Sequence, residues 1–465
     1  MFLKGREKMF KNRIVEIIDS HENEITDIAR KIWENPEPGY KEVFASGIQS
    51  KFLKENGFTI KAIDGMDTAF IAEYGSGKPV IGFMGEYDAL EGQSQKISAS
   101  MQPINAGAAG HGCGHNLLGA GSLGAALGLK ELMEEEGIKG SIRYYGCPAE
   151  ELLSGKVRMA ATGAFSDLTC AFSWHPFDIN APFYAGANAV ANVNFRFKGT
   201  ASHAAQAPQN GRSALDAVEL MNVGVNYLRE HVPDSVRMHY VITDGGERPN
   251  IVPSIAASWY TVRGPKVKDM KDALDRIIKI ANGAAIMTET EMEHEVTSAA
   301  YDYKPNRFLT SIIEENMKFV GTPKYSEEDY DFAEKLAATM SRDQRESVLA
   351  GFGASRSLSS KVLHDELGGV DMRNMTVGGS FDMGDVSYII PCAQLAGAAW
   401  PLGTPAHTWQ ACASSGHSMG YKAAIMASKV LAATAYDVLK DGTITDRAWD
   451  EFKAETDGKE YKSIK

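Results

Sequence analysis

The sequence has few cysteines, no cluster of basic residues and no long apolar run. Five cysteines among 465 residues are too few for a disulfide-stapled scaffold and favour a reducing compartment. No uninterrupted apolar stretch reaches the roughly 18 residues that a membrane-spanning helix needs. Residues 1–6 already carry charge and do not resemble the apolar core of a signal peptide. We therefore expect a soluble, cytoplasmic protein.

Positive charge is also scarce, because the formal net charge is −12. Proteins that bind nucleic acids usually carry a basic face, and no run of lysine or arginine is present. This charge balance argues against a nucleic-acid or membrane partner. It also means that an anionic substrate gains nothing from long-range attraction, so a few local groups have to recognise it.

The length is sufficient for two or three domains. Short apolar segments alternate with helical patterns over residues 1–189 and again over 303–465. This alternation is typical of an α/β domain with a mixed, mostly parallel sheet sandwiched by helices. We expect one long amphipathic helix over residues 9–35 and a hairpin formed by strands 68–74 and 80–84 around a Gly-Ser-Gly-Lys turn.

Residues 190–302 show a different pattern. In residues 192–198 apolar and polar side chains alternate, as in a strand with one buried face. The segments that follow have the order β-α-β-β-α-β, which is the ferredoxin-like arrangement. We predict an α+β domain inserted into the larger one, whose two parts are residues 1–189 and 303–465.

Acidic and histidine side chains follow four of the predicted strands in the larger domain. They are Glu86 and Asp88 after strand 80–84, Glu150 and Glu151 after 141–147, His175 after 168–174, and His407 after 393–400. Ligands of open α/β sheets bind beyond the carboxyl ends of the strands. We expect these side chains to lie close together although they are far apart in the sequence.

Cys113 and His115 are separated only by a glycine, which permits a backbone tight enough for both side chains to reach one point. A thiolate and an imidazole suit a divalent ion such as zinc. A glycine-rich loop with a buried cysteine is an equally good interpretation of this segment alone. Glu150 and Glu151 fit a metal ligand and a neighbouring general base, but also a solvated acidic turn.

Three residues of the inserted domain are candidates for substrate contacts. His203 follows a predicted strand, and Asn250 and Arg263 flank another. Either of the latter two can bind a carboxylate, arginine in bidentate fashion. A surface histidine and a structural salt bridge of Arg263 are the alternatives.

The motifs in their order resemble the co-catalytic metallopeptidases that include glutamate carboxypeptidase and aminoacylase, and within them the amidohydrolase branch that uses Cys-Gly-His. The motifs that carry the resemblance are Gly85-Glu86-Tyr87-Asp88-Ala89-Leu90, Cys113-Gly114-His115, Pro148-Ala149-Glu150-Glu151, Trp174-His175-Pro176, Ser202-His203-Ala204-Ala205 and Thr404-Pro405-Ala406-His407. Each motif alone is weak, but six in one order over nearly the whole chain are specific.

The resemblance implies a hydrolase of linear amide bonds with two divalent ions, zinc or manganese. Its expected substrate is an N-acyl amino acid such as p-aminobenzoyl-glutamate, a similar aroyl- or acyl-amino acid, or a dipeptide. The inserted domain would be a lid that forms a homodimer, or pairs with a homologous partner subunit. The residue roles that it implies are metal ligation by Cys113, His115, Glu151, His175 and His407, general base catalysis by Glu150, oxyanion stabilisation by His203, and carboxylate binding by Asn250 and Arg263.

One departure from the wider family concerns Glu86, which stands where a metal-ligating histidine is usual. Ligation by Glu86 is therefore open, and Asp88 is expected to orient a ligand instead of touching metal. Two alternative functions remain. The chain could be a regulatory or partner subunit of a hetero-oligomeric amidohydrolase, or a cysteine hydrolase with Cys113 as nucleophile and His115 as base.

Overall fold

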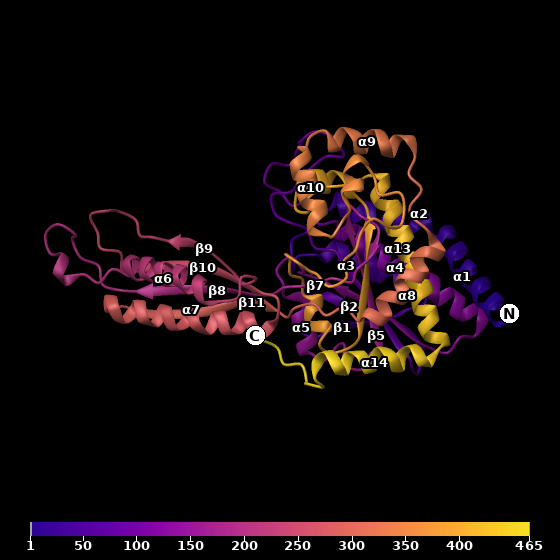
Figure 1. Cartoon of the computed structure of the whole chain (residues 1–465), viewed down its shortest axis with the longest axis horizontal. Helices are drawn as coiled ribbons and strands as arrows, with labels where there is room; N and C mark the ends of the chain where they lie inside the picture. The colour runs from indigo at the N-terminus through magenta and orange to yellow at the C-terminus, as the bar shows by residue number, and fades with distance from the viewer. Residues whose placement is uncertain (1, 465) are drawn as a thin grey trace. The chain divides into compact units, whose positions relative to one another are not determined.

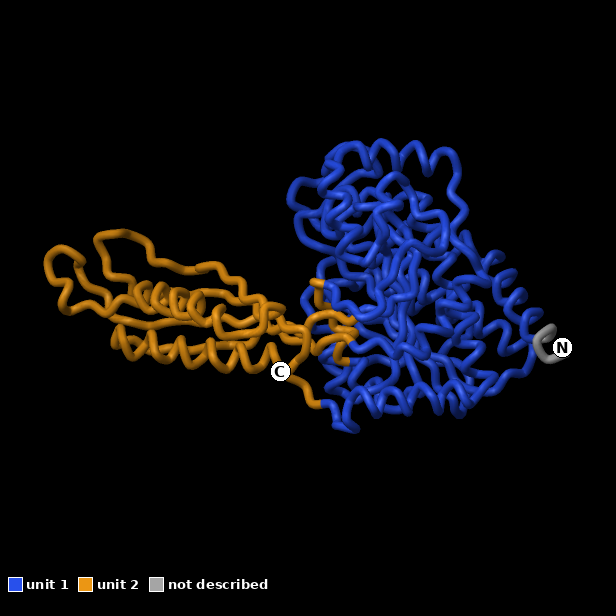
Figure 2. Tube along the Cα trace, in the orientation of Figure 1, with its two compact units in different colours: residues 1–185, 304–377, 386–461 blue, residues 186–303, 378–385, 462–465 orange. Residues whose placement is uncertain are grey.

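The computed structural model describes residues 2–464, which form two compact units (Figure 2). Unit 1 comprises Met1–Ala185, Lys304–Val377 and Val386–Tyr461, and unit 2 comprises Gly186–Tyr303, Gly378–Asp385 and Lys462–Lys465. The second unit therefore includes two short segments that lie far from its main part in the sequence.

Unit 1 contains a seven-stranded sheet in the order β1-β2-β4-β3-β5-β13-β6. Figure 1 labels its strands β1, β2 and β5. The central strands β4, β3, β5 and β13 run parallel, and the outer pairings are antiparallel. This confirms the predicted mixed, mostly parallel sheet. The strands are β1 Thr59–Ile63, β2 Met66–Ser76, β3 Val80–Glu86, β4 Gly140–Cys147, β5 Cys170–Phe177, β6 Ala181–Pro182 and β13 Cys392–Ala398.

The predicted hairpin is wrong, because β4 lies between β2 and β3. Every residue of β3 is buried, and β3 has a parallel partner on each side, β4 and β5. A strand buried on both faces is typical of the centre of a parallel sheet. The Gly-Ser-Gly-Lys turn reverses the chain direction whether the next strand pairs with β2 or lies one position further along the sheet. The turn alone therefore does not determine whether β3 pairs with β2.

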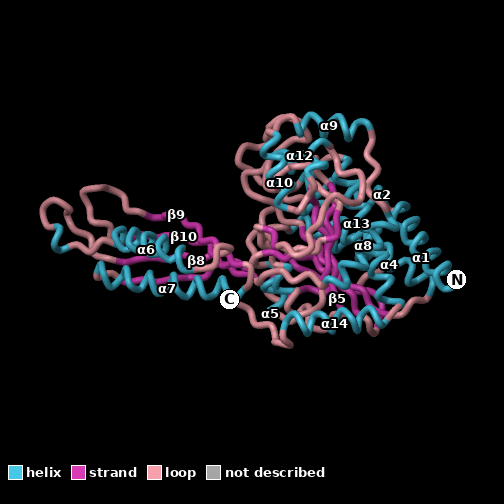
Figure 3. Tube along the Cα trace, in the orientation of Figure 1, coloured by secondary structure: helices cyan, strands magenta, loops and turns pink. Residues whose placement is uncertain are grey.

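Helices surround the strands of unit 1 (Figure 3). The single helix predicted over residues 9–35 is two helices, because the first ends at Ser20 and the second begins at Glu22. The isoleucines of both are buried, as their spacing predicts. The helices of unit 1 are α1 Phe2–Ser20, α2 Glu22–Glu34, α3 Val43–Glu55, α4 His115–Glu136, α5 Gly155–Ala161, α8 Arg307–Val320, α9 Glu327–Ala337, α10 Arg342–Gly351, α12 Trp409–Ser415, α13 Ser418–Lys440 and α14 Gly442–Thr456.

The core of unit 1 is built around α4 and α13, which pack against each other and against β5. Helix α4 comes close to the sheet at Gly121, where a Cβ atom would lie 2.6 Å from the indole nitrogen of Trp174. Trp174 is fully buried and donates a hydrogen bond from Nε1 to the Leu118 carbonyl (3.1 Å). This contact fixes α4, which begins at His115, against β5, the strand that contains His175.

Unit 2 has a four-stranded antiparallel sheet in the order β11-β8-β10-β9. The element order β8-α6-β9-β10-α7-β11 and this strand order confirm the predicted ferredoxin-like arrangement. Val193, Phe195 and Phe197 of β8 are buried, whereas the residues between them are exposed. The elements are β8 Ala189–Lys198, α6 Ala214–Leu228, β9 Arg237–Asp244, β10 Ile255–Gly264, α7 Val267–Thr288 and β11 Glu291–Ala300.

Within residues 2–464, no helix combines the length and the apolar composition that crossing a membrane requires.

The close packing at Gly121 predicts opposite effects for two Gly→Ala substitutions in helices of unit 1. Gly121→Ala forces a methyl group into the Trp174 ring and should lower the free energy of unfolding by about 1–3 kcal/mol. Gly47→Ala, in α3, places a methyl group where no atom lies within 4 Å, and should raise it by up to about 1 kcal/mol through helix propensity. Urea denaturation followed by tryptophan fluorescence measures both. Equal effects of the two substitutions would contradict this account of the packing.

Candidate metal centre

The candidate centre lies beyond the carboxyl ends of the parallel strands of unit 1. Glu86 is the last residue of β3, His175 lies near the end of β5, and the acidic pair follows β4. Cys113 and His115 lie at the start of α4, and His407 lies in the loop between β13 and α12. The structure thus brings together all the candidate residues of the larger domain.

The predicted ligands form two groups that share Cys113. One group is Cys113, His115 and His175, and the other is Cys113, Glu151 and His407; within each, the possible ligand atoms lie within 4.8 Å of one another. Cys113 Sγ is 3.5 Å from His175 Nε2, and His407 Nε2 is 3.5 Å from Glu151 Oε2. Sulfur, imidazole and carboxylate ligands in this proximity suit divalent ions such as zinc.

Hydrogen bonds at Nδ1 orient two of the histidines. His115 donates from Nδ1 to Asp88 Oδ1 (2.9 Å), and His175 donates from Nδ1 to the Pro176 carbonyl (2.8 Å). In the neutral ring each bond leaves Nε2 with its lone pair, which is how metal-binding histidines are usually held. His115 Nε2 and Glu151 Oε1 are buried and have no hydrogen-bond partner among the described residues. Buried polar atoms rarely lack a partner, and a bound cation would provide one for both of these atoms.

Backbone geometry positions the acidic pair. Ala149 has a positive φ of 55°, which is unusual for a residue other than glycine, and its N–H donates to Glu42 Oε1 (2.8 Å). The N–H of Glu151 donates to Asp88 Oδ2 (2.9 Å). Asp88 therefore holds both His115 and the backbone of Glu151, and touches a candidate ligand on each side.

Burial shifts the pKa values of the candidate ligands. Burial, with the charge of Glu151, raises the pKa of the Cys113 thiol well above its usual value. Burial raises the pKa of Glu151 to about 7 and lowers that of His175 to about 4. Burial also lowers the pKa of His115, but the charges of Cys113 and Asp88 outweigh it and raise this pKa well above its usual value. A divalent cation would favour the anionic thiolate and carboxylate, so the donor set fits bound metal.

Sequence reasoning did not find Lys156, which lies in the first turn of α5. Its side chain is fully buried, and its Nζ lies 2.6 Å from Glu86 Oε1. The sequence signal is a lysine in a short helix that closely follows the acidic pair, and such a lysine usually reaches solvent.

Sequence reasoning also missed an aromatic cluster beside His175. Phe177 lies two residues after His175 in β5 and therefore on the same face of the strand. The ring centroids of His175 and Phe177 are 4.6 Å apart, and those of Phe177 and Phe352 are 4.9 Å apart. Both phenylalanines are half-buried, and Phe177 is directly beside a candidate ligand.

The three candidates of the inserted domain belong to unit 2. His203 and Asn250 are exposed and lie in adjacent loops, where the Ala204 N–H donates to the Asn250 carbonyl (3.0 Å). Arg263 is near the far end of β10 and donates to Ser380 Oγ (2.7 Å). The eight steps from Ile255 to Arg263 span about 26 Å of strand. One unit 2 therefore presents Asn250 and Arg263 at two separate places, not around one carboxylate.

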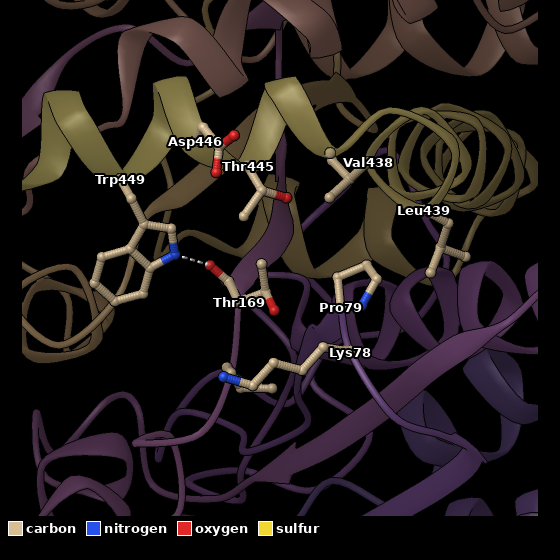
Figure 4. Close-up of a pocket in the computed structure, with 10 residues that line it drawn as sticks. Lys78, Pro79, Thr169, Val438, Leu439, Thr445, Asp446 and Trp449 are labelled. Carbon is tan, nitrogen blue, oxygen red and sulfur yellow. Dashed lines mark hydrogen bonds between the residues drawn. The ribbon is translucent and has the colours of Figure 1, made fainter.

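A surface pocket of about 430 Å³ lies elsewhere in unit 1, between the start of α14 and the residues that precede β3 and β5 (Figure 4). Its lining includes Lys78, Thr169 and Trp449, whose Nε1 donates to the Thr169 carbonyl (2.9 Å). This pocket is at the amino ends of the parallel strands, whereas the candidate metal centre is at their carboxyl ends.

Comparison with known proteins identifies the family. The model of the M20 peptidase dimerisation domain matches residues 186–288, which are most of unit 2. The chain is 38% identical over 461 residues to the B subunit of p-aminobenzoyl-glutamate hydrolase from Escherichia coli, and the match covers 96% of each protein. It is 29% identical to the Xaa-Arg dipeptidase of Mus musculus, over 96% of this chain and 93% of that protein.

A solved structure shares the fold. It is a dinuclear metal-binding peptidase of the M20 family from Bacillus subtilis, with a TM-score of 0.60 and 17% sequence identity over 91% of this chain and 99% of that chain. The identity of 38% over nearly the full length of both proteins confirms the family resemblance of the motifs. The chain belongs to the M20 family of metallopeptidases and amidohydrolases, and it is a hydrolase of that family.

Proposed function

We propose that the protein is a metal-dependent amidohydrolase that cleaves the amide bond of an N-acyl amino acid. The observation that carries the proposal is the convergence of Cys113, His115, Glu151, His175 and His407 next to Glu150 at one edge of the sheet. The names of the relatives support it, because one is named for the hydrolysis of p-aminobenzoyl-glutamate and another is a dipeptidase. We infer the same substrate or a similar aroyl- or acyl-amino acid or dipeptide.

We infer two divalent ions, zinc or manganese, held by the two groups that share Cys113. When bound, such ions polarise the amide carbonyl and lower the pKa of a water molecule towards neutrality. The similar fold of a dinuclear M20 peptidase supports this number of ions. Asp88 does not ligate metal in this proposal, since its oxygens accept hydrogen bonds from His115 and from the backbone of Glu151.

Glu150 is the proposed general base. Its Oε2 lies 3.8 Å from His115 Nε2, so the carboxylate is at the rim of the ligand set. It would take the proton of the attacking water and then pass it to the leaving amine. His203 would donate a hydrogen bond to the carbonyl oxygen as negative charge develops there. Arg263 of one subunit and Asn250 of a second copy would bind the carboxylate of the substrate, because one unit 2 holds the two residues about 26 Å of strand apart.

The role of Glu150 predicts that Glu150→Gln separates metal binding from turnover. We expect the variant to retain the metal content of the wild type, because the proposed ligands are intact, and to lose about 10²–10⁴-fold in kcat. Metal analysis of the purified protein and hydrolysis of p-aminobenzoyl-glutamate measure the two properties.

Three results would contradict the proposal. Near-wild-type turnover by Glu150→Gln would exclude it as the base. Activity that survives EDTA but not iodoacetamide would favour a Cys113 nucleophile. A relative is named as one subunit of a hydrolase, so turnover that requires a second M20 chain would favour a partner-subunit function.

The half-buried rings of Phe177 and Phe352 support an aromatic acyl group. Phe177 lies next to His175, one of the proposed ligands, where the scissile bond would be placed, and Phe352 packs against Phe177. Aromatic pairs contribute about 0.5–1.5 kcal/mol beyond the area that they bury. An aryl ring bonded to the reacting carbonyl could stack on them, whereas an acetyl group is too small to do so.

This contact predicts that Phe352→Ala changes selectivity among acyl groups. We expect kcat/KM for p-aminobenzoyl-glutamate to fall about 3–10-fold relative to that for N-acetyl-glutamate. Phe308→Ala is the matched control, because Phe308 is also half-buried but packs under Arg447 of α14. Equal losses on both substrates in Phe352→Ala would remove the basis for an aromatic acyl site.

We also propose that unit 2 forms a homodimer. Strand β9 is at the edge of its sheet, and exposed Val241 of β9 pairs with exposed Trp259 of β10. On α6, Val223 is 52% and Tyr227 73% exposed, one helical turn apart. An open edge strand and an exposed apolar stripe are features of a protein interface. The match to the dimerisation-domain model supports this assignment.

The dimer predicts that the double substitution Val223→Asp, Tyr227→Asp yields a monomer, because it places charge in the apolar stripe of α6. Light scattering coupled to size-exclusion chromatography measures the mass. Ile286→Asp is the control, since Ile286 on α7 is 80% exposed but outside the stripe, and should leave the dimer intact. A wild-type protein that is monomeric at micromolar concentration would contradict the proposal.

A further inference from the structure

We propose that Lys156 is a positioning residue that keeps Glu86 out of the metal ligand set. This inference rests on the proposed function, because it concerns the same metal centre. It assigns a role to a buried ion pair that the ligands and the general base do not explain.

The pair is buried and direct. Lys156 has a fully buried side chain, and its Nζ lies 2.6 Å from Glu86 Oε1. Removing an ammonium from water costs free energy that only a well-placed partner offsets. Lysine in a core is rare for this reason, so a lysine at this place is more consistent with a function in the site than with packing.

Glu86 has the position of a metal ligand. Its second oxygen, Oε2, is 3.3 Å from His115 Nε2, the atom that the Asp88 hydrogen bond leaves available. Glu86, His115 and Glu150 form a further group whose possible ligand atoms lie within 4.8 Å of one another. By proximity alone Glu86 is closer to His115 Nε2 than the proposed ligand Glu151, whose Oε1 is 4.0 Å away.

The ion pair with Lys156 distinguishes the Glu86 carboxylate from that of Glu151. The Glu86 oxygen that contacts Nζ already binds a full positive charge, and a carboxylate engaged in this way donates less well to a metal ion. The ammonium also adds a fixed positive charge close to the centre, which opposes the binding of cations. We infer that Lys156 weakens metal binding moderately and preserves the coordination in which Glu151, not Glu86, is the ligand.

The test measures metal affinity directly. In Lys156→Met the Glu86 carboxylate is freed and the positive charge is lost, so we expect zinc to bind at least tenfold more tightly and kcat to fall at least tenfold. Competition with a chromophoric chelator, using the purified full-length chain, measures the zinc affinity. Glu86→Gln removes one negative charge beside His115 Nε2 and keeps the buried ammonium, so we expect zinc to bind at least tenfold more weakly.

The double substitution Glu86→Gln, Lys156→Met removes both charges and should return zinc affinity to within about threefold of the wild type, so the two effects are not additive. It also provides a readout if either single variant does not fold. Lys130→Met is the matched control, because Lys130 is a largely buried lysine on α4 paired with Glu134 (2.6 Å), and it should leave zinc affinity unchanged.

Wild-type or weaker zinc affinity in folded Lys156→Met would overturn the inference, and so would a double variant whose affinity differs from the wild type by more than tenfold. The proposed function fails separately. A wild-type protein that binds zinc and shows the predicted affinity changes, but hydrolyses no N-acyl amino acid, would disprove the substrate proposal and leave the role of Lys156 intact.

Discussion

The buried hydrogen bond between His115 and Asp88 is the interaction on which the candidate centre depends. It fixes the proton of His115 on Nδ1 and directs Nε2 to the point where the other possible ligands meet. The second oxygen of Asp88 accepts from the backbone of Glu151, so one carboxylate ties the start of α4 to the loop after β4. Because Asp88 follows β3, three separate segments are held in register by one side chain.

The surrounding packing gives this bond its rigidity. Gly121 allows α4 to lie against Trp174, and Trp174 precedes His175 in β5. The helix that supplies His115 and the strand that supplies His175 are thus joined by a contact that tolerates no extra methyl group. Ligand sets have to be held to within a fraction of an ångström to be effective, and close packing of buried elements is the means that this fold provides.

The sequence predicted those parts of the fold and site that depend on local pattern. The alternation in β8 and the order of elements predicted unit 2. The rule that ligands bind beyond strand ends predicted that Glu150, His175 and His407 lie close together. The pairing of strands depends on contacts between segments that are far apart in the sequence. β4, and not β2, is the neighbour of β3, because a central parallel strand has a parallel partner on each side. Lys156 could not be recognised, since burial of one lysine is a property of the folded core and leaves no periodic signal.

The separation of His203 and Asn250 from Arg263 along β10 bears on why a hydrolase of this kind would dimerise. If these three residues all serve catalysis, a single unit 2 cannot place all of them at one active site. About 26 Å of β10 separates Arg263 from the end of the strand near His203 and Asn250. In the proposed homodimer, His203 and Asn250 of one subunit would serve the centre of its partner. Dimerisation would then complete the active site and would be a condition for activity, beyond any gain in stability. The net charge of −12 adds to the importance of these three residues, because the protein does not attract an anionic substrate over a distance and has to bind it through local groups.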